Sequence, residues 1–337
     1  MQLVFWVTTD CNLRCSYCYE GQTKKKEYMN SKTAICAIDY FLTLYRQTDD
    51  SELMVRFHGG EPLLNTDVIL AIQEHINASV ERNNVFYSIT TNGCVFSKKA
   101  MHILENCMDE INISIDGMKE INDKYRKDSH GKGSYEQAIR TANHLKNHLD
   151  IHSINIRITY NSSTVEHLAE SIIHFISLGF TEILPAEDLF DAGWSAEKIL
   201  TLKEQLNIVK CYISTIKEKL HIGGLEPSHF KKRGLCNGGI SNFHICPNGN
   251  IYPCTYVVNE DEFCLGNVFQ GIDFQRVQKL RLLYSCLNKI CLGCTYYDFC
   301  PSTRCKLVNW KLTGNCFEPS GVMCAAEQAK LKINNLI

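Results

Sequence analysis

The sequence lacks any uninterrupted apolar run that approaches the roughly 20 residues needed to cross a bilayer. It also lacks a basic segment ahead of its first apolar stretch, residues 3–7, so we expect no secretory signal peptide. The net charge is only -2 over 337 residues, so composition gives no reason to expect nucleic acid or an anionic membrane as a partner. We therefore expect a cytoplasmic protein.

Cysteine, by contrast, is abundant, because the chain contains 18. In a secreted protein this number would indicate disulfides, but without an export signal metal ligation is the better explanation. A chain of 337 residues with 45% hydrophobic content can bury a large core and is expected to form two domains. Oxygen-labile metal clusters would further suggest an anaerobic or microaerobic cytoplasm.

Three of the cysteines, Cys11, Cys15 and Cys18, follow the first apolar stretch with three and two residues between them. Iron–sulfur cubanes normally take four thiolates, so a run of three leaves one iron open for chemistry. Tyr17 adds an aromatic side chain next to the third cysteine. The alternative is a set of buried or zinc-binding cysteines.

Strand and helix patterns alternate through the first 190 residues, which predicts parallel βα units. Six such units are too few for an eight-stranded barrel, so we predict the α/β class with an open, partial (β/α)6 barrel. In such barrels the catalytic groups lie at the carboxyl ends of the strands, where the cysteine triplet falls. The predicted strands are 3–8, 53–57, 85–90, 110–115, 154–160 and 182–185, and the clearest helices are 31–47, 66–82, 135–149 and 165–178.

The next three strand ends carry turn motifs. The second predicted strand is followed by Gly59-Gly60-Glu61-Pro62, in which the glycines allow close backbone approach and the carboxylate can accept from an ammonium group. An ordinary strand-to-helix turn would explain these residues about as well. Asn92-Gly93 and Asp116-Gly117 end the following strands and are ordinary turn dipeptides too. Their order at successive strand ends favours one common site.

Together these motifs resemble the radical SAM superfamily over residues 1–190. The resemblance implies that Cys11, Cys15 and Cys18 hold a [4Fe–4S] cluster whose open iron binds S-adenosylmethionine (SAM). It implies that the Glu61 element contacts the amino group of the methionine, and that Ser114 and Arg126 lie near its ribose and carboxylate. The SAM-contacting residues implied in this way are Tyr17, Gly59, Gly60, Glu61, Asn92, Ser114 and Arg126.

The remainder of the chain changes character. Residues 191–234 read as a charged, solvated helical bridge, and residues 235–337 form a cysteine-rich second domain. Four of its cysteines, Cys291, Cys294, Cys300 and Cys305, would favour a zinc site if they stood alone. The spacing of the whole set resembles the SPASM extension of radical SAM enzymes, which carries two auxiliary [4Fe–4S] clusters. The implied ligands are Cys236, Cys254 and Cys305 for the first cluster, and Cys291, Cys294, Cys300 and Cys324 for the second.

Three details of this set depart from the family or stay open. Four residues separate Cys300 from Cys305, where the family usually has three. Cys316 lies within reach as an alternative to Cys324, although Cys324 fits the family spacing better. Cys246 does not match the position of an extra ligand, so we expect the first auxiliary cluster to keep an open iron. We expect His58, His130 and His244 to be structural.

The resemblance implies an enzyme in which a reduced cluster cleaves SAM to a 5′-deoxyadenosyl radical. We predict a maturase that modifies a ribosomally made peptide by forming a thioether crosslink from cysteine. The alternatives are a sulfatase-maturing oxidase that forms formylglycine and a non-catalytic metal-cluster scaffold. In the sulfatase branch an aspartate follows the second SPASM cysteine, and Thr255 stands at that position here.

The implied partners are a peptide or protein substrate, cysteine-rich and with a leader, and an electron donor such as flavodoxin or ferredoxin. Since the chain starts at the first barrel strand, we expect no room for an N-terminal leader-binding domain. Leader recognition would then fall to the catalytic domains or to a separate protein.

Overall fold

The computed structural model describes residues 1–21, 25–48, 52–226 and 231–334. It divides into two compact units: unit 1 comprises Met1–Asn12, Glu20–Asn112 and Asn237–Ser285, and unit 2 comprises Leu13–Tyr19, Ile113–Cys236 and Cys286–Ile337. Each unit combines three separate segments of the chain. The domains predicted from the sequence, 1–190, 191–234 and 235–337, are successive segments, and their bounds stay a prediction.

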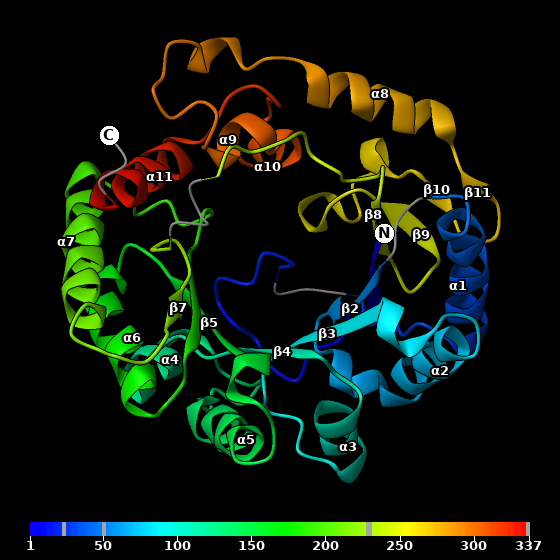
Figure 1. The fold of residues 1–337 in the computed structure, drawn as a ribbon, viewed down its shortest axis with the longest axis horizontal. Helices are drawn as coiled ribbons and strands as arrows, with labels where there is room; N and C mark the ends of the chain where they lie inside the picture. Colours follow the sequence, from blue (N-terminus) through cyan, green and yellow to red (C-terminus); the bar gives the residue numbers. More distant parts are fainter. Residues whose placement is uncertain (22–24, 49–51, 227–230, 335–337) are drawn as a thin grey trace. The chain divides into compact units, whose positions relative to one another are not determined.

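Unit 1 is built on a mainly parallel sheet flanked by helices (Figure 1). Its elements are β1 (Gln2–Thr8), α1 (Ser31–Tyr45), β2 (Leu53–Gly59), η1 (Pro62–Asn65), α2 (Thr66–Asn77), η2 (Arg82–Asn84), β3 (Val85–Thr91), α3 (Lys98–Asn106), β8 (Asn242–Ile245), β9 (Asn250–Tyr252), η6 (Thr255–Val257), η7 (Asp261–Phe263), β10 (Gly266–Asn267), β11 (Gly271–Ile272) and α8 (Phe274–Ser285). β1 pairs in parallel with both β2 and β8, and β2 pairs in parallel with β3. The pairs from β8 to β11 are antiparallel.

Unit 2 repeats the alternation of strand and helix and ends in four helical segments. β4 (Glu110–Ser114) begins in unit 1 and ends in unit 2. The other elements are α4 (Lys119–Tyr125), α5 (Tyr135–Lys146), η3 (Ile151–Ser153), β5 (Ile154–Tyr160), η4 (Val165–His167), α6 (Leu168–Ser177), β6 (Glu182–Glu187), α7 (Ala196–Ile213), β7 (His221–Ile222), η8 (Lys289–Cys291), α9 (Pro301–Arg304), α10 (Lys306–Thr313) and α11 (Gly321–Ile333). β5 pairs in parallel with β6, and β6 with β7.

The sheet of unit 1 has two distinct faces, which the strand register identifies. Phe243 of β8 packs on Phe41 of α1 with ring centroids 4.9 Å apart, and Tyr87 of β3 donates to Asn77 of α2 at 2.8 Å. These contacts define the face that the helices cover. The opposite face carries the intervening side chains, among them those of Trp6, Arg56, His58 and His244.

Helix starts in both units follow capping rules that are readable in the sequence. Asn30 accepts from the backbone N–H of Thr33 at 2.8 Å, and Ser320 accepts from that of Met323 at 3.1 Å. Such a cap satisfies an otherwise unpaired donor and stabilises a helix by about 1 kcal/mol.

The predicted α/β class is confirmed, and all six predicted strands are present as β1 to β6. The expected bridging helix is shorter than its charge pattern suggested, because α7 ends at Ile213 and β7 follows. Gly224, after β7, adopts a φ of +84°. Glycine adopts this left-handed conformation easily, and it does not occur within an α-helix. The sequence reasoning also missed α3, a nine-residue helix with two lysines in its first turn.

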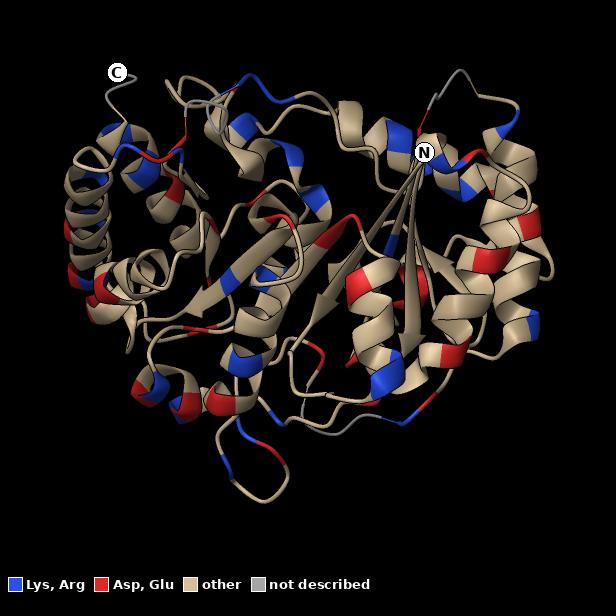
Figure 2. Cartoon of the chain, turned by 60° about the horizontal axis from the view of Figure 1, so that its bottom comes forward, with Lys and Arg blue, Asp and Glu red and all other residues tan. Residues whose placement is uncertain are grey.

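Charged residues lie mainly on helices and loops, and the strands are largely free of them (Figure 2). Among the described helices, none has both the length and the apolar character that a membrane crossing would require.

Candidate radical SAM site

Cys11 lies directly after β1 in unit 1, at the carboxyl end of the strand. Its backbone N–H donates to Oδ1 of Asp10 at 2.9 Å, and its thiol is half-buried. The Asn92 amide nitrogen lies 3.7 Å from the Cys11 sulfur and donates to Oδ1 of Asn12 at 2.8 Å. Asn92, predicted to contact SAM, therefore lies beside the first cysteine of the triplet.

Gly59 and Gly60 are required by the close approach of their backbone to the end of β1. A Cβ on Gly59 would lie 2.1 Å from the Thr8 carbonyl oxygen, and one on Gly60 would lie 2.2 Å from that of Asp10. Gly59 also has a φ of +124°. This packing explains both glycines by contact with the segment that leads into Cys11.

Glu61 is fully buried and joins the ends of two strands. One carboxylate oxygen accepts from the Leu63 N–H at 3.1 Å and from the Thr91 hydroxyl at 2.8 Å, and the other accepts from the Asn92 N–H at 2.7 Å. These three hydrogen bonds hold the carboxylate in place at the ends of β2 and β3. Its predicted contact with an ammonium group stays a prediction.

Cys15, Tyr17 and Cys18 lie in unit 2, where a turn brings the Cys18 N–H to the Cys15 carbonyl at 3.0 Å. Both thiols are half-buried. The Tyr17 hydroxyl donates to Oδ2 of Asp116 at 2.5 Å and accepts from Nη1 of Arg126 at 2.7 Å. Burial raises the pKa of Asp116, which Arg126 opposes. Tyr17 is thus held between an acidic side chain, Asp116, and a basic one, Arg126.

Arg126 keeps one donor unused. Its Nε is buried and has no hydrogen-bond partner among the described residues. Leaving a buried donor unsatisfied is costly, so this atom indicates a missing acceptor. A carboxylate such as that of SAM would fit the charge of Arg126. Ser114, also predicted near SAM, is half-buried at the end of β4.

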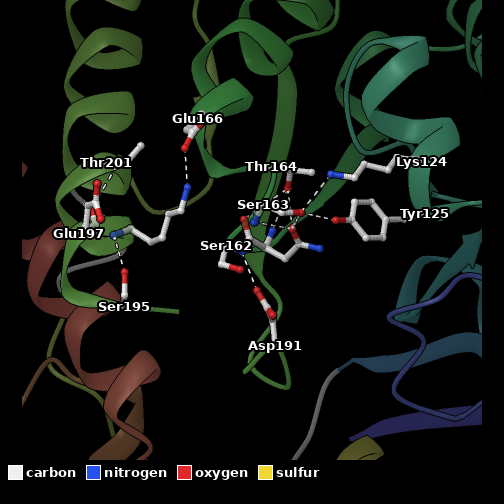
Figure 3. Close-up of polar contacts among 12 residues, drawn as sticks. Lys124, Tyr125, Ser162, Ser163, Thr164, Glu166, Asp191, Ser195, Glu197 and Thr201 are labelled. Carbon is white, nitrogen blue, oxygen red and sulfur yellow. Dashed lines mark hydrogen bonds and ion pairs between the residues drawn. The ribbon is translucent and has the colours of Figure 1, made fainter. Parts of the chain in front are cut away.

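The loop after β5 is fixed by polar contacts within unit 2 (Figure 3). Asp191 accepts from the Ser162 N–H at 2.7 Å, and the Ser163 hydroxyl contacts Tyr125 and accepts from Lys124 at 3.3 Å. These side chains satisfy one another, so we assign this loop a structural role.

Electrostatic interactions link several C-terminal cysteines of unit 2, and the pair Cys300–Cys305 joins members of the two predicted ligand sets. Cys291 interacts electrostatically with Cys324 and Cys294, and burial together with these thiols raises its pKa. Burial and then Cys236 raise the pKa of Cys305 to about 11. The choice of Cys324 over Cys316 as the last ligand stays a prediction.

Cys254 lies in unit 1, half-buried at the start of η6, and Cys300 is half-buried before α9 in unit 2. Cys246 is buried in the hairpin of β8 and β9, where its N–H donates to the Asn250 carbonyl at 2.9 Å. Burial raises the pKa of the Cys246 thiol. Whether Cys246 is a ligand stays a prediction.

No three His, Cys, Asp or Glu side chains of the described residues converge closely enough to hold a single metal ion. A cubane suits more widely spaced thiolates, because each one binds a different iron of the cluster. The thiolate donors and the unpaired Arg126 Nε fit the cluster and SAM.

Sequence reasoning missed two residues that contact predicted site residues, one in each unit. Thr91 is buried and donates to Glu61, and Asp116 holds the Tyr17 hydroxyl. Both residues belong to the strand-end segments, but the sequence of those segments does not predict which side chains point inward.

Residues 7–172 match the model of the radical SAM superfamily. An uncharacterized protein of Methanocaldococcus jannaschii is 30% identical over 267 residues, 79% of this chain and 88% of that protein. A cysteine-type anaerobic sulfatase-maturating enzyme of Clostridium novyi is 27% identical over 88% of this chain and 85% of its own length. A mycofactocin maturase of Mycolicibacterium smegmatis is 25% identical, with 88% and 76% covered.

Solved structures share the fold. The structure of anSMEcpe with bound AdoMet superposes with a TM-score of 0.78 at 18% identity, covering 98% of this chain and 96% of that one. SuiB of Streptococcus suis, bound to its precursor peptide SuiA, gives a TM-score of 0.68 at 17% identity, covering 96% and 75%. The resemblance found in the sequence is confirmed, and the scaffold alternative is set aside because the chain is an enzyme. The chain belongs to the radical SAM superfamily.

Proposed function

We propose that this enzyme is a maturase of a ribosomally made peptide or of a protein, and that it forms thioether crosslinks from cysteine. The maturase function is supported by two relatives that align along 88% of this chain. One is named a sulfatase-maturating enzyme and the other a mycofactocin maturase. Because both align through the cysteine-rich C-terminal third, the similarity extends well beyond the radical SAM core.

Cys11, Cys15 and Cys18 are the residues we assign to a [4Fe–4S] cluster with SAM on its open iron. The reduced cluster and SAM together supply a 5′-deoxyadenosyl radical that removes hydrogen from a substrate carbon. Arg126 offers its buried Nε to the SAM carboxylate, and Tyr17 fixes the guanidinium through Nη1. Asn92 offers its amide beside Cys11.

Two auxiliary [4Fe–4S] clusters complete the proposed cofactors. Cys236, Cys254 and Cys305 are assigned to the first, and Cys291, Cys294, Cys300 and Cys324 to the second. The electrostatic pairs Cys236–Cys305 and Cys291–Cys324 agree with these groupings, whereas the pair Cys300–Cys305 links the two sets. An electron donor of the flavodoxin or ferredoxin type and a cytoplasmic location belong to the same proposal.

Thr255 favours thioether formation over formylglycine formation. A threonine hydroxyl cannot serve as the carboxylate proton acceptor that the sulfatase branch places after the second SPASM cysteine. The Thr255 Oγ1 is buried and has no hydrogen-bond partner among the described residues, so no neighbour activates it. The Clostridium novyi relative keeps the sulfatase-type oxidase as a second candidate.

The test is an anaerobic assay of the reconstituted enzyme with SAM, a reductant and the short cysteine-containing peptides encoded beside its gene. We expect 5′-deoxyadenosine and a peptide that has lost two hydrogen atoms per crosslink and no longer reacts with thiol reagents at one cysteine. A cysteine-containing sulfatase peptide is the parallel substrate. An aldehyde formed on that peptide, with the encoded peptides unchanged, would replace the thioether proposal by the oxidase.

A further inference from the structure

Lys306 is a buried cation without a hydrogen-bond partner. It is the first residue of α10, its side chain is 1% exposed, and its Nζ has no acceptor among the described residues. A positive charge at a helix N-terminus opposes the helix dipole, and burying an unpaired ammonium costs further free energy. Lys306 is thus unfavourable both for the helix dipole and for charge burial, and such a double cost indicates a functional role.

The surroundings of Lys306 are thiols and one aromatic ring. Its Nζ lies 4.9 Å from the centroid of the Phe317 ring. Burial lowers the pKa of Lys306, and the nearby thiols of Cys286, Cys291 and Cys316 oppose that shift. One of these thiols, Cys291, is a proposed ligand of the second auxiliary cluster. Hydrogen bonds connect the same segments: the Cys291 N–H donates to the Asn288 carbonyl at 3.0 Å. The Asn288 side chain in turn shares the Ser302 carbonyl with Asn309, which lies one turn beyond Lys306 on α10.

Unsatisfied polar atoms occur on α10 and on segments that contact it. Asn288 and Asn309 both donate to the Ser302 carbonyl, at 3.2 and 2.8 Å, which brings their side chains together. Their Oδ1 atoms and the Ser302 hydroxyl are buried without partners among the described residues. Native proteins contain few such atoms, so the polar partners in this part of unit 2 are incomplete among the described residues.

We propose that Lys306 is the counter-charge of the second auxiliary cluster and raises its reduction potential. Four thiolates make a [4Fe–4S] cluster an anion, and one-electron reduction adds a further negative charge. A cation held in a poorly screened interior stabilises the reduced form more than the oxidised form. The inference rests on the ligand set proposed above and is independent of which peptide is modified.

The experiment compares Lys306→Met and Lys306→Arg in a Cys11/Cys15/Cys18→Ala background, which leaves only the auxiliary clusters. EPR-monitored redox titration gives the midpoint potential of each cluster, and iron counting gives its occupancy. We expect Lys306→Met to move one midpoint to more negative potential and to leave the other in place, while Lys306→Arg stays near the parent. Lys289→Met is the matched control, since Lys289 is exposed and two residues from Cys291.

An unchanged midpoint in Lys306→Met at full iron content would overturn the proposal. If Lys306→Met and Lys306→Gln lose iron while Lys306→Arg retains it, the cluster requires the cation, which supports the proposal. Loss of iron in all three variants would instead make the residue a packing element and count against it. If a Cys291/Cys294/Cys300/Cys324→Ala variant keeps the iron content of its parent, these cysteines do not hold a cluster. That result would refute the proposed ligand set, independently of the role of Lys306.

Discussion

The hydroxyl group of Tyr17 connects the cysteine triplet to an acidic and a basic side chain in unit 2. Tyr17 lies in the triplet, and its oxygen bridges Asp116 and Arg126, which are both buried. Burial makes these hydrogen bonds important, because losing one leaves charged groups without a partner. At the scale of the residue, Tyr17 therefore positions Asp116 and Arg126 in addition to contributing its ring to packing.

Tyr17→Phe should lower the free energy of unfolding by about 1–3 kcal/mol and weaken SAM binding, because Arg126 and Asp116 each lose a partner. Thermal denaturation and a SAM titration followed by the EPR spectrum of the cluster measure the two effects. Tyr28→Phe is the matched control, since the exposed Tyr28 hydroxyl also donates to an aspartate, Asp10, at 2.7 Å. Equal losses in both variants would contradict a special role for Tyr17.

Burial fixes His244 in its neutral form. It accepts from the Trp6 indole at 3.3 Å, and burial first, then His58 and Arg56, lower its pKa to about 3. The unfolded chain binds the proton near pH 6.5, so stability is full above that pH and is lost as pH falls toward 3. At pH 5.5 the loss is about 1.4 kcal/mol. Urea denaturation from pH 8 to 5.5 should show this slope in the wild type and not in His244→Gln.

The glycine pair can be tested by steric means alone. Gly60 has no positive φ, yet an added Cβ would meet the Asp10 carbonyl oxygen at 2.2 Å, so Gly60→Ala must displace the segment that leads into Cys11. We expect loss of about four irons per chain in reconstitution, the content of one cubane. Gly234→Ala, whose added Cβ meets nothing within 4 Å, should keep them. Full iron in Gly60→Ala would show that the segment adapts.

At the scale of elements, α11 is fastened to the carboxyl ends of two strands in unit 2. Lys330 of α11 donates to both oxygens of Glu187 in β6, at 3.0 and 2.9 Å, and to Glu327 at 3.0 Å. The Tyr160 hydroxyl of β5 donates to Glu187 at 3.0 Å. Burial alone would lower the pKa of Lys330, but the two carboxylates raise it above its usual value. Cys324, a proposed cluster ligand, lies on the same helix.

Lys330→Met should destabilise the protein by about 3–5 kcal/mol, because it leaves two buried carboxylates without a cation. Lys332→Met changes the same residue type on the exposed side of α11 and should cost less than about 0.5 kcal/mol. Adding Glu187→Gln to Lys330→Met should recover part of the loss, as denaturant unfolding would show. No recovery would mean that packing of the lysine stem, rather than charge, dominates.

For the whole molecule, the iron content tests the three proposed clusters together. We expect about twelve irons per chain after anaerobic reconstitution, and about four fewer in a Cys11/Cys15/Cys18→Ala variant. Chemical analysis of iron and sulfide measures both. Four irons or fewer in the wild type, with zinc in their place, would return the C-terminal third to a structural metal site.

The sequence was sufficient for features that repeat along the chain. Strand alternation gave β1 to β6, and cysteine spacing gave the candidate ligands, because both patterns are local. It did not reveal that Lys306 is buried or that Lys330 pairs with Glu187, since these depend on which segments fold together. Charge patterning also overextended α7, because a solvated face does not show where a helix ends.

The pairing of β1 with β8 has a consequence for how the chain folds. Gln2 pairs with Asn242 across nearly the whole sequence, so β1 keeps one open edge until most of the chain has left the ribosome. Long-range parallel pairing of this kind folds slowly and leaves an apolar edge exposed to other chains. The nascent protein is therefore a natural client for chaperones, and its yield should depend on translation rate and temperature more than its final stability does.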